Sequence, residues 1–213
     1  MHTQIAYRGK IKYDEATAKA YQERPPRQHA AEIALIDRVL RAMPTCRTML
    51  DLPCGAGRVS LHLAQRGYAV TCADNSASML QLTRRVLEQN GLDCAIDQQD
   101  IEALTYNDRQ FDAILCFRLF HHFPTPEIRQ RAVAELTRVA RRYVALSYFS
   151  PWSATSVKRR LRAALGGRPS QKYATPCSEV CAYFTPHGFR LVADFARSPL
   201  LHTLHVALFE RVQ

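Results

Sequence analysis

The stretch Thr48-Met-Leu-Asp-Leu-Pro-Cys-Gly-Ala-Gly-Arg58 decides the fold of this 213-residue chain. A short apolar run, Met49 to Leu52, leads into a loop that holds Gly55 and Gly57, and a helical pattern starts directly after it. Glycine has no Cβ and accepts positive φ, so a strand–turn–helix of this kind lets a small ligand lie against bare backbone. We therefore expect a ligand-binding turn here.

A carboxylate on the next apolar run indicates the kind of ligand. Asp74 follows Asp51 at the end of the run 68–73, where an acidic side chain is placed to accept hydrogen bonds from two ribose hydroxyls. A dinucleotide loop needs G-x-G-x-x-G, but Ser60 occupies the third glycine place. Asp51 also suits a cationic ligand group better than a pyrophosphate. The pattern favours a nucleoside cofactor, and a strand–turn–helix without a ligand is the alternative.

Composition sets outer limits on the class of protein. Hydrophobic residues make up 47% of the chain and charged residues 23%, which is typical of a soluble globular domain. The first ten residues carry no signal-peptide pattern, and no apolar run reaches the about 18 residues of a membrane span, so we expect a cytoplasmic protein. The seven cysteines predict reduced, buried thiols and no metal site. A net charge of +10 alone is not taken to indicate nucleic acid.

Strand-like and helical patterns alternate along the chain, which predicts a mainly parallel sheet with right-handed crossovers. The last two strands are joined by only about six residues, too few for a parallel crossover, so the final strand should be antiparallel. We expect one domain over 1–213, with an N-terminal helical cap over 1–45 and a substrate-side insertion over 150–185. The expected strands are 49–52, 68–73, 94–98, 111–117, 143–149, 189–195 and 202–209, and the expected helices 28–43, 58–66, 76–90, 127–139, 154–165 and 178–184.

The glycine turn resembles motif I of class I S-adenosylmethionine-dependent methyltransferases, written D-x-G-x-G-x-G. Asp51, Gly55 and Gly57 match, and Pro53 replaces the first glycine. Proline fixes φ and has no N–H, so the first bend of the loop must differ. The resemblance covers residues 45–150 well and the rest loosely. It implies a small-molecule methyltransferase with a Rossmann-like, doubly wound α/β fold and seven strands in the order 3-2-1-4-5-7-6, the last strand antiparallel and helices on both faces.

The same resemblance implies S-adenosyl-L-methionine as cofactor and S-adenosyl-L-homocysteine as product. Asp51 would orient the cationic amino-acid end, Asp74 would hold the ribose, and Asp100 with Ile101 would hold the adenine. Phe117 would line the pocket or belong to the core. The expected cofactor-binding residues are Asp51, Leu52, Pro53, Cys54, Gly55, Gly57, Asp74, Asn75, Met79, Asp100, Ile101 and Phe117.

Three residues are candidates for a catalytic base. Methyl transfer from a sulfonium is an in-line displacement, so the protein mainly supplies position and exclusion of water, but a weak nucleophile also needs a base. His121 and His122 follow the fourth strand, and Tyr148 lies near the end of the fifth. We take these three as candidate bases. The alternative for the histidines is capping or packing at the start of a helix.

Four residues are candidates for binding the methyl acceptor. The guanidinium of Arg118 suits a carboxylate or phosphate, and Tyr13 and Tyr21 resemble a lid segment of the family. Trp152 with the basic segment 154–165 predicts a surface for an acidic or lipid-linked acceptor and for peripheral membrane contact. The alternatives are a surface charge for Arg118, tyrosines that pack a helix, and a solvated helix face for 154–165.

Three functions remain open at this point. The preferred one is methylation of a metabolite or lipid-linked compound at oxygen, nitrogen or carbon. An RNA or protein methyltransferase is the second, although the fourth strand is followed by Cys116-Phe-Arg-Leu119 and not by the Asn/Asp-Pro-Pro-Tyr type of motif that many nucleic-acid amino-methylating enzymes carry. The third is a non-catalytic nucleoside-binding module.

Overall fold

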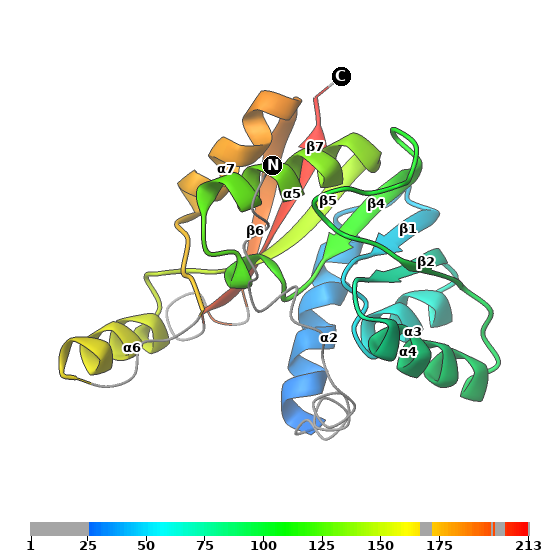
Figure 1. Ribbon diagram of the computed structural model, residues 1–213, viewed down its shortest axis with the longest axis horizontal. Coiled ribbons are helices and arrows are strands. Elements are labelled where there is room, and N and C mark those ends of the chain that lie inside the picture. Colours follow the sequence, from blue (N-terminus) through cyan, green and yellow to red (C-terminus); the bar gives the residue numbers. More distant parts are fainter. Residues whose placement is uncertain (1–25, 167–171, 197, 199–202, 213) are drawn as a thin grey trace, which may run out of the picture.

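The computed structural model describes residues 26–166, 172–196, 198 and 203–212 (Figure 1). Within them, seven strands form one sheet in the order β3-β2-β1-β4-β5-β7-β6, as the sequence predicted. The strands are β1 (Thr48–Asp51), β2 (Ala69–Asp74), β3 (Ala95–Gln98), β4 (Phe111–Cys116), β5 (Ala140–Phe149), β6 (Phe189–Ala196) and β7 (Leu204–Arg211).

Helices cover both faces of the sheet. The helices are α2 (Pro26–Arg41), α3 (Arg58–Gln65), α4 (Ala77–Gln89), α5 (Pro126–Val139), α6 (Ala154–Ala164) and α7 (Cys177–Phe184), with short 3-10 turns η1 (Phe120–His122) and η2 (Thr185–His187). Their bounds agree with the predicted ones to within a few residues. None of the helices in the described part of the chain is long and apolar enough to cross a bilayer.

Two apolar layers hold the sheet between the helices. On one face α5 and α7 bury Leu136 and Phe184 against the sheet. On the other face α2, α3 and α4 bury side chains that include Ile36, Leu63 and Leu80. The central strands β1 and β4 are almost wholly buried, because helices cover both of their faces, and this explains their continuous apolar sequence.

Strand β7 reverses direction and lies between β5 and β6. It pairs antiparallel with both neighbours, for example Ser147 with Val206 and Asp194 with Ala207. The short connection from β6 forced this result, because a parallel return would have needed a crossover segment. The prediction of an antiparallel final strand is therefore confirmed.

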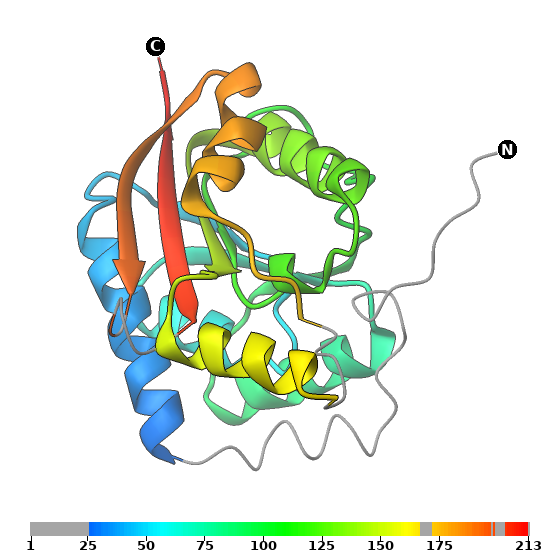
Figure 2. The same cartoon turned by 90° about the vertical axis from the view of Figure 1, so that its left-hand side faces the viewer.

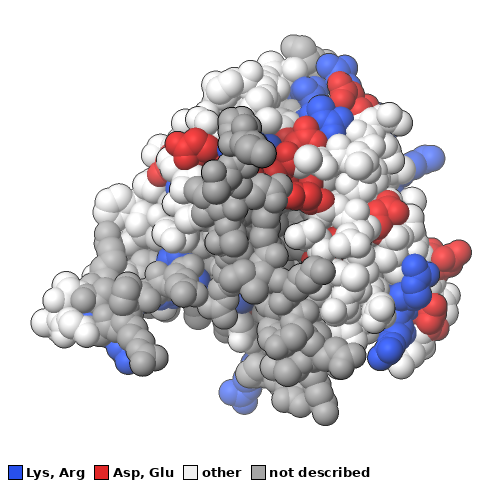
Figure 3. All heavy atoms as spheres, in the orientation of Figure 1, with Lys and Arg blue, Asp and Glu red and all other residues white. Residues whose placement is uncertain are grey.

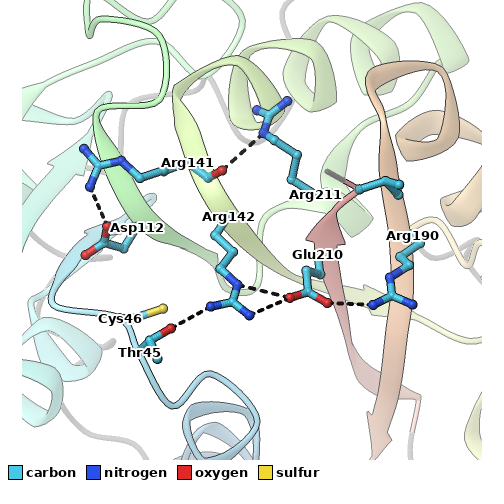
Figure 4. Close-up of a pocket in the computed structure, with 9 residues that line it drawn as sticks. Thr45, Cys46, Asp112, Arg141, Arg142, Arg190, Glu210 and Arg211 are labelled. Atoms are coloured by element: carbon cyan, nitrogen blue, oxygen red, sulfur yellow. Dashed lines mark hydrogen bonds and ion pairs between the residues drawn. The ribbon is translucent and has the colours of Figure 1, made fainter.

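An ionic ladder ties the three C-terminal strands together at the amino-terminal edge of the parallel sheet (Figure 4). Glu210 on β7 accepts from Arg142 on β5 at 2.9 Å and from Arg190 on β6 at 3.1 Å. Arg142 also donates to the hydroxyl of Thr45, 2.8 Å away, just before β1. The ladder links β5, β7 and β6 through their side chains at the edge opposite the glycine loop.

Removal of the shared carboxylate tests the ladder. Arg142 holds the pKa of Glu210 below its usual value, so its stabilisation is present above the ordinary carboxylate pKa and is lost as pH falls through the lower native pKa. We expect Glu210→Gln to lower the free energy of unfolding by no more than about 1 kcal/mol at neutral pH, and by less in high salt, because the pairs are near the surface. Urea titrations measure this.

The matched control is Glu88→Gln, which removes the same charge from an exposed position on α4. It should change stability little at any pH. Equal losses in the two variants, or a loss for Glu210→Gln that persists in acid, would contradict a stabilising ladder.

Candidate functional site

The glycine loop joins β1 to α3 through two left-handed residues. Gly55 has φ 56° and Gly57 has φ 77°, and Gly57 stands directly before the first residue of α3. The Leu52–Pro53 peptide bond is cis. The loop therefore turns sharply and presents backbone at the carboxyl end of β1.

Helix α4 contacts this loop through Thr83, a residue that was not predicted from the sequence. The Thr83 hydroxyl donates to the carbonyl oxygen of Gly55 at 2.8 Å. A Cβ added at Gly57 would lie 3.0 Å from the Thr83 Cα, which is tighter than nine in ten real Cβ contacts, so that α4 or the loop would have to shift by a few tenths of an ångström. Gly57 is therefore needed both for its φ and for the close packing of the loop on α4.

Asp74 binds the loop from the end of β2. Its Oδ2 accepts from the N–H of Gly55 at 3.0 Å, and its Oδ1 accepts from the N–H of Ser76 at 2.9 Å. Burial raises the pKa of this carboxyl above its ordinary value, although the backbone donors oppose the shift. Each carboxylate oxygen keeps a further lone pair, so the group can accept additional hydrogen bonds from a ligand beside the loop.

Asp51 is buried more deeply than Asp74. It is fully buried, and its Oδ2 accepts from the hydroxyl of Ser60 at 2.6 Å. Burial raises the pKa of Asp51 to about 7. Ser60 occupies the place of the missing third glycine, so its role here is to bind Asp51 within the first turn of α3. A contact of Asp51 with a cationic cofactor group stays a prediction.

The expected adenine-side residues follow β2 and β3 at the same edge. The N–H of Gln99 donates to the carbonyl of Asp74 at 3.1 Å, which brings the end of β3 to the end of β2. Asp100 accepts from the N–H of Glu102 at 3.0 Å, and Ile101 is buried. Because β1, β2 and β3 are parallel neighbours, the three aspartates mark one edge of the sheet.

Two further predicted cofactor residues lie between these points. The carbonyl oxygen of Asn75 accepts from the side chain of Gln98 at 2.9 Å, and Met79 is buried in the first turn of α4. Phe117 is buried on the face covered by α2, which favours its alternative reading as a core residue.

A buried carboxylate on α2 connects the glycine loop to the segment after β4. Glu32 pairs with Arg58 at 2.6 Å through one oxygen and with Arg118 through the other. Arg118 has φ 66°, a left-handed conformation that is uncommon for a non-glycine residue and is often found at functional sites. Arg58 is the first residue of α3, so Glu32 holds both sides of the expected site.

Next to this bridge lies a cavity of about 510 Å³ whose charged lining is mainly cationic. The cations are Arg27, Arg118, Arg159 and Lys172, whereas Glu32 is the acidic residue of the lining and is shared by two arginines. The Phe149 ring forms part of the wall, with Arg159 and Lys172 each 5.7 Å from its centroid. This combination favours an anionic group beside an apolar surface.

Two of the three candidate bases, His121 and His122, lie beside the Phe149 wall of this cavity. His121 stacks on Phe149 with ring centroids 3.8 Å apart, and its ring nitrogens have no hydrogen-bond partner among the described residues. Burial, reinforced by His122 and nearby cations, lowers the pKa of His121 to about 2. His122 is also buried in η1. A neutral imidazole with so low a pKa is a poor proton acceptor.

Tyr148 faces the apolar layer under α5 and α7. Its hydroxyl donates to Oδ2 of Asp194 at 2.8 Å, and the same oxygen contacts Nδ1 of His205 at 2.8 Å. Burial raises the pKa of Tyr148 far above its ordinary value. This placement favours a structural role for Tyr148 and does not bring it to the cavity.

Three further residues were predicted to bind the acceptor, namely Trp152, Tyr13 and Tyr21. Trp152 is 71% exposed in the turn before α6. Tyr13 and Tyr21 lie outside the described residues. In the described part of the chain, no three His, Cys, Asp or Glu side chains are grouped so that they could hold a metal ion.

The strand order, the reversed β7 and the glycine loop beside Asp74 define a class I methyltransferase type of α/β domain. Residues 49–142 match the family model described as a methyltransferase domain. The match and the strand order both support a place for this chain in the class I S-adenosylmethionine-dependent methyltransferase family.

Similar proteins extend this result. A ubiquinone biosynthesis O-methyltransferase of Coxiella burnetii is 39% identical over 79 residues, which are 37% of this chain and 34% of that protein. The chain thus aligns with about a third of the length of the curated relatives it matches. Magnesium protoporphyrin IX methyltransferase of Synechocystis PCC 6803, solved with bound SAH, has a TM-score of 0.72 at 19% identity. The alignment covers 87% of this chain and 84% of the chain of that protein.

Structural likeness at this level shows the fold alone. The [4+2]-cyclase SpnF has a TM-score of 0.64 at 15% identity, with coverage of 82% of this chain and 81% of its own. The same fold thus occurs in proteins named for different reactions, and the activity of this chain has to be argued from its site.

The packing of the glycine loop yields a stability prediction. Gly57→Ala adds a Cβ against Thr83 and also disfavours φ 77°, so we expect a loss of about 2–4 kcal/mol in the free energy of unfolding. Gly67→Ala is the matched control, because Gly67 has φ 84° with nothing within 4 Å of the added Cβ. It should cost about 1–2 kcal/mol. Denaturant unfolding compares them, and equal losses would show that packing on α4 does not require Gly57.

Proposed function

We propose that this chain is an S-adenosylmethionine-dependent methyltransferase that acts on a small anionic acceptor. The observation that carries the proposal is the hydrogen bond from Gly55 to Asp74. It places an open backbone turn and a ribose-type carboxylate side by side at the carboxyl edge of parallel strands, where ligands of such sheets bind.

The cofactor would lie along this edge. S-adenosylmethionine supplies a methyl group bound to a positively charged sulfur. The backbone at Gly55 and Gly57 allows close approach, Asp74 offers free lone pairs to ribose hydroxyls, and Asp100 with Ile101 borders the expected adenine position. The work of these residues is to fix the cofactor relative to the cavity beside Arg118 and to exclude water from it.

The cavity indicates the chemical class of the acceptor. Glu32 is already paired with Arg58 and Arg118, and three further cations line the same space, namely Arg27, Arg159 and Lys172. His121 is a weak base and Tyr148 is engaged with Asp194, so an acceptor that arrives already ionised fits the site better than one that must lose a proton during transfer. A carboxylate or a similar anion next to an apolar body meets both conditions.

The proposal also covers the type of acceptor, the location of the protein and its domain organisation. The methyltransferase names of the curated relatives support a small-molecule acceptor, and we retain this over an RNA or protein substrate. A lipid-linked acceptor with peripheral membrane contact, a cytoplasmic location and one domain over 1–213 are part of the proposal. The non-catalytic nucleoside-binding module is the alternative that the binding and turnover tests below separate.

Cofactor binding tests the role of Asp74. In Asp74→Asn an amide nitrogen, which is a donor, replaces one acceptor oxygen. It would face the N–H of Gly55 or that of Ser76, and it could not accept a hydrogen bond from a ribose hydroxyl. We expect the dissociation constant for S-adenosylmethionine to rise at least about tenfold, measured by calorimetry with S-adenosylhomocysteine and NAD for comparison.

Asp93→Asn is the control, since Asp93 is exposed before β3 and should bind as the wild type does. Unchanged affinity in Asp74→Asn would remove the ribose assignment. Binding of S-adenosylmethionine without methylation of any acceptor would favour the non-catalytic module.

An acceptor screen tests the cationic cavity. Each aromatic or aliphatic carboxylate is paired with its neutral amide, and we expect methyl transfer to the carboxylates alone. Arg159→Gln should raise KM for the accepted carboxylate by about tenfold, because one charge that faces the anion is lost. Arg85→Gln, which removes an exposed arginine of α4, is the control. Equal turnover of acids and amides would exclude an anionic acceptor.

A further inference from the structure

Helix α6 carries its apolar residues on the outside. Leu161 is 59% exposed, Leu165 just after the helix is 86% exposed, and Val157 is 39% exposed. These positions follow one another at intervals of four and so form one stripe along the helix. Ser153 and Ser156, in contrast, are buried at the start of α6. The first turn of the helix therefore meets the body of the protein through small polar side chains, whereas the two leucines further along are exposed.

This arrangement opposes the pattern of the other helices. In α2, α3, α4 and α5 the apolar side chains lie in the two core layers. Helix α6 instead projects from the body in Figure 1, and it lies in front of the body in the turned view of Figure 2. Exposed leucines on a projecting helix have a free-energy cost in water, which an apolar environment would remove.

The charges around the stripe indicate the nature of that environment. Lys158 and Arg162 are exposed and flank the stripe on one side, and no aspartate or glutamate occurs between Glu135 and Glu179. In Figure 3 the projecting corner shows uncharged surface with basic side chains and no acidic ones. Trp152, 71% exposed just before the helix, is of the type that prefers the interface between water and lipid.

We propose that α6, with Trp152 and the stripe Val157, Leu161 and Leu165, is a docking surface for an anionic lipid membrane. The leucines would enter the outer acyl region while Lys158 and Arg162 contact anionic headgroups. A second copy of the chain fits this surface less well, because pairing two such stripes would bring basic residues together without acidic partners.

Helix α6 also contributes to the cationic cavity. Arg159 lies on the side of the helix away from the stripe, packs over the Phe149 ring and lines the cavity. Docking of α6 on a membrane would thus bring a helix that lines the cavity to the lipid that carries an anionic acceptor. This link to the acceptor rests on the proposed function, whereas the docking surface itself does not.

Vesicle sedimentation with the full chain tests the proposal. The wild type should bind phosphatidylcholine vesicles that contain phosphatidylglycerol, bind pure phosphatidylcholine vesicles weakly, and bind less in about 1 M salt than in about 0.1 M salt. The double variant Leu161→Ser, Leu165→Ser should lose roughly tenfold or more of the partition coefficient. The matched control is Leu191→Ser, Val192→Ser, which changes exposed apolar residues of β6 and should bind as the wild type does.

The same samples separate this inference from the proposed function. Calorimetry with S-adenosylmethionine in solution should give the same affinity for the wild type and both double variants. Failure of the wild type to bind anionic vesicles, or equal loss in the two double variants, would overturn the docking surface. So would a dimer in sedimentation that the Leu161, Leu165 variant abolishes. If the wild type binds anionic vesicles but does not bind S-adenosylmethionine, only the proposed function would be overturned.

Discussion

The hydrogen bond between the Gly55 N–H and the Asp74 carboxylate is the contact on which the rest of the site depends. It joins the ends of two parallel strands whose own ladder stops at Asp51 and Cys72. Thr83 holds the opposite side of the same segment, because its hydroxyl donates to the carbonyl oxygen of Gly55 and also lies 3.6 Å from Sγ of Cys54. The loop is thus fixed both from a strand and from a helix.

A second constraint acts across the site from α2. Glu32 is buried, and a buried carboxylate is stable only when opposite charges compensate it. Arg58 and Arg118 provide that compensation from the start of α3 and from the segment after β4. The position of α2, the entry of α3 and the left-handed backbone at Arg118 therefore depend on one another, although they are far apart in sequence. The same neutralisation leaves the neighbouring cavity cationic.

Local patterns predicted the fold well and the site in part. The glycine turn and Asp74 were recognisable because their roles follow from backbone geometry and spacing, and the reversed β7 followed from a connection length. Glu32 was not recognised, since its partners lie on other elements; a carboxylate on the apolar face of helix 26–41, beside Leu35 and Ile36, was the available signal. Tyr148 was predicted at the edge of the site and lies in the apolar layer under α5 and α7; a buried strand has two apolar faces, and its sequence does not distinguish them.

The position of β7 has a consequence for the order in which the chain is made. Strand β5 is complete long before residues 204–211 are synthesised, yet β7 is the strand that covers its free edge and separates it from β6. Until β7 arrives, β5 presents unpaired backbone groups that other strands can join. The sheet is therefore completed only once residues 204–211 have been made, and the edge of β5 lacks its β7 partner until then.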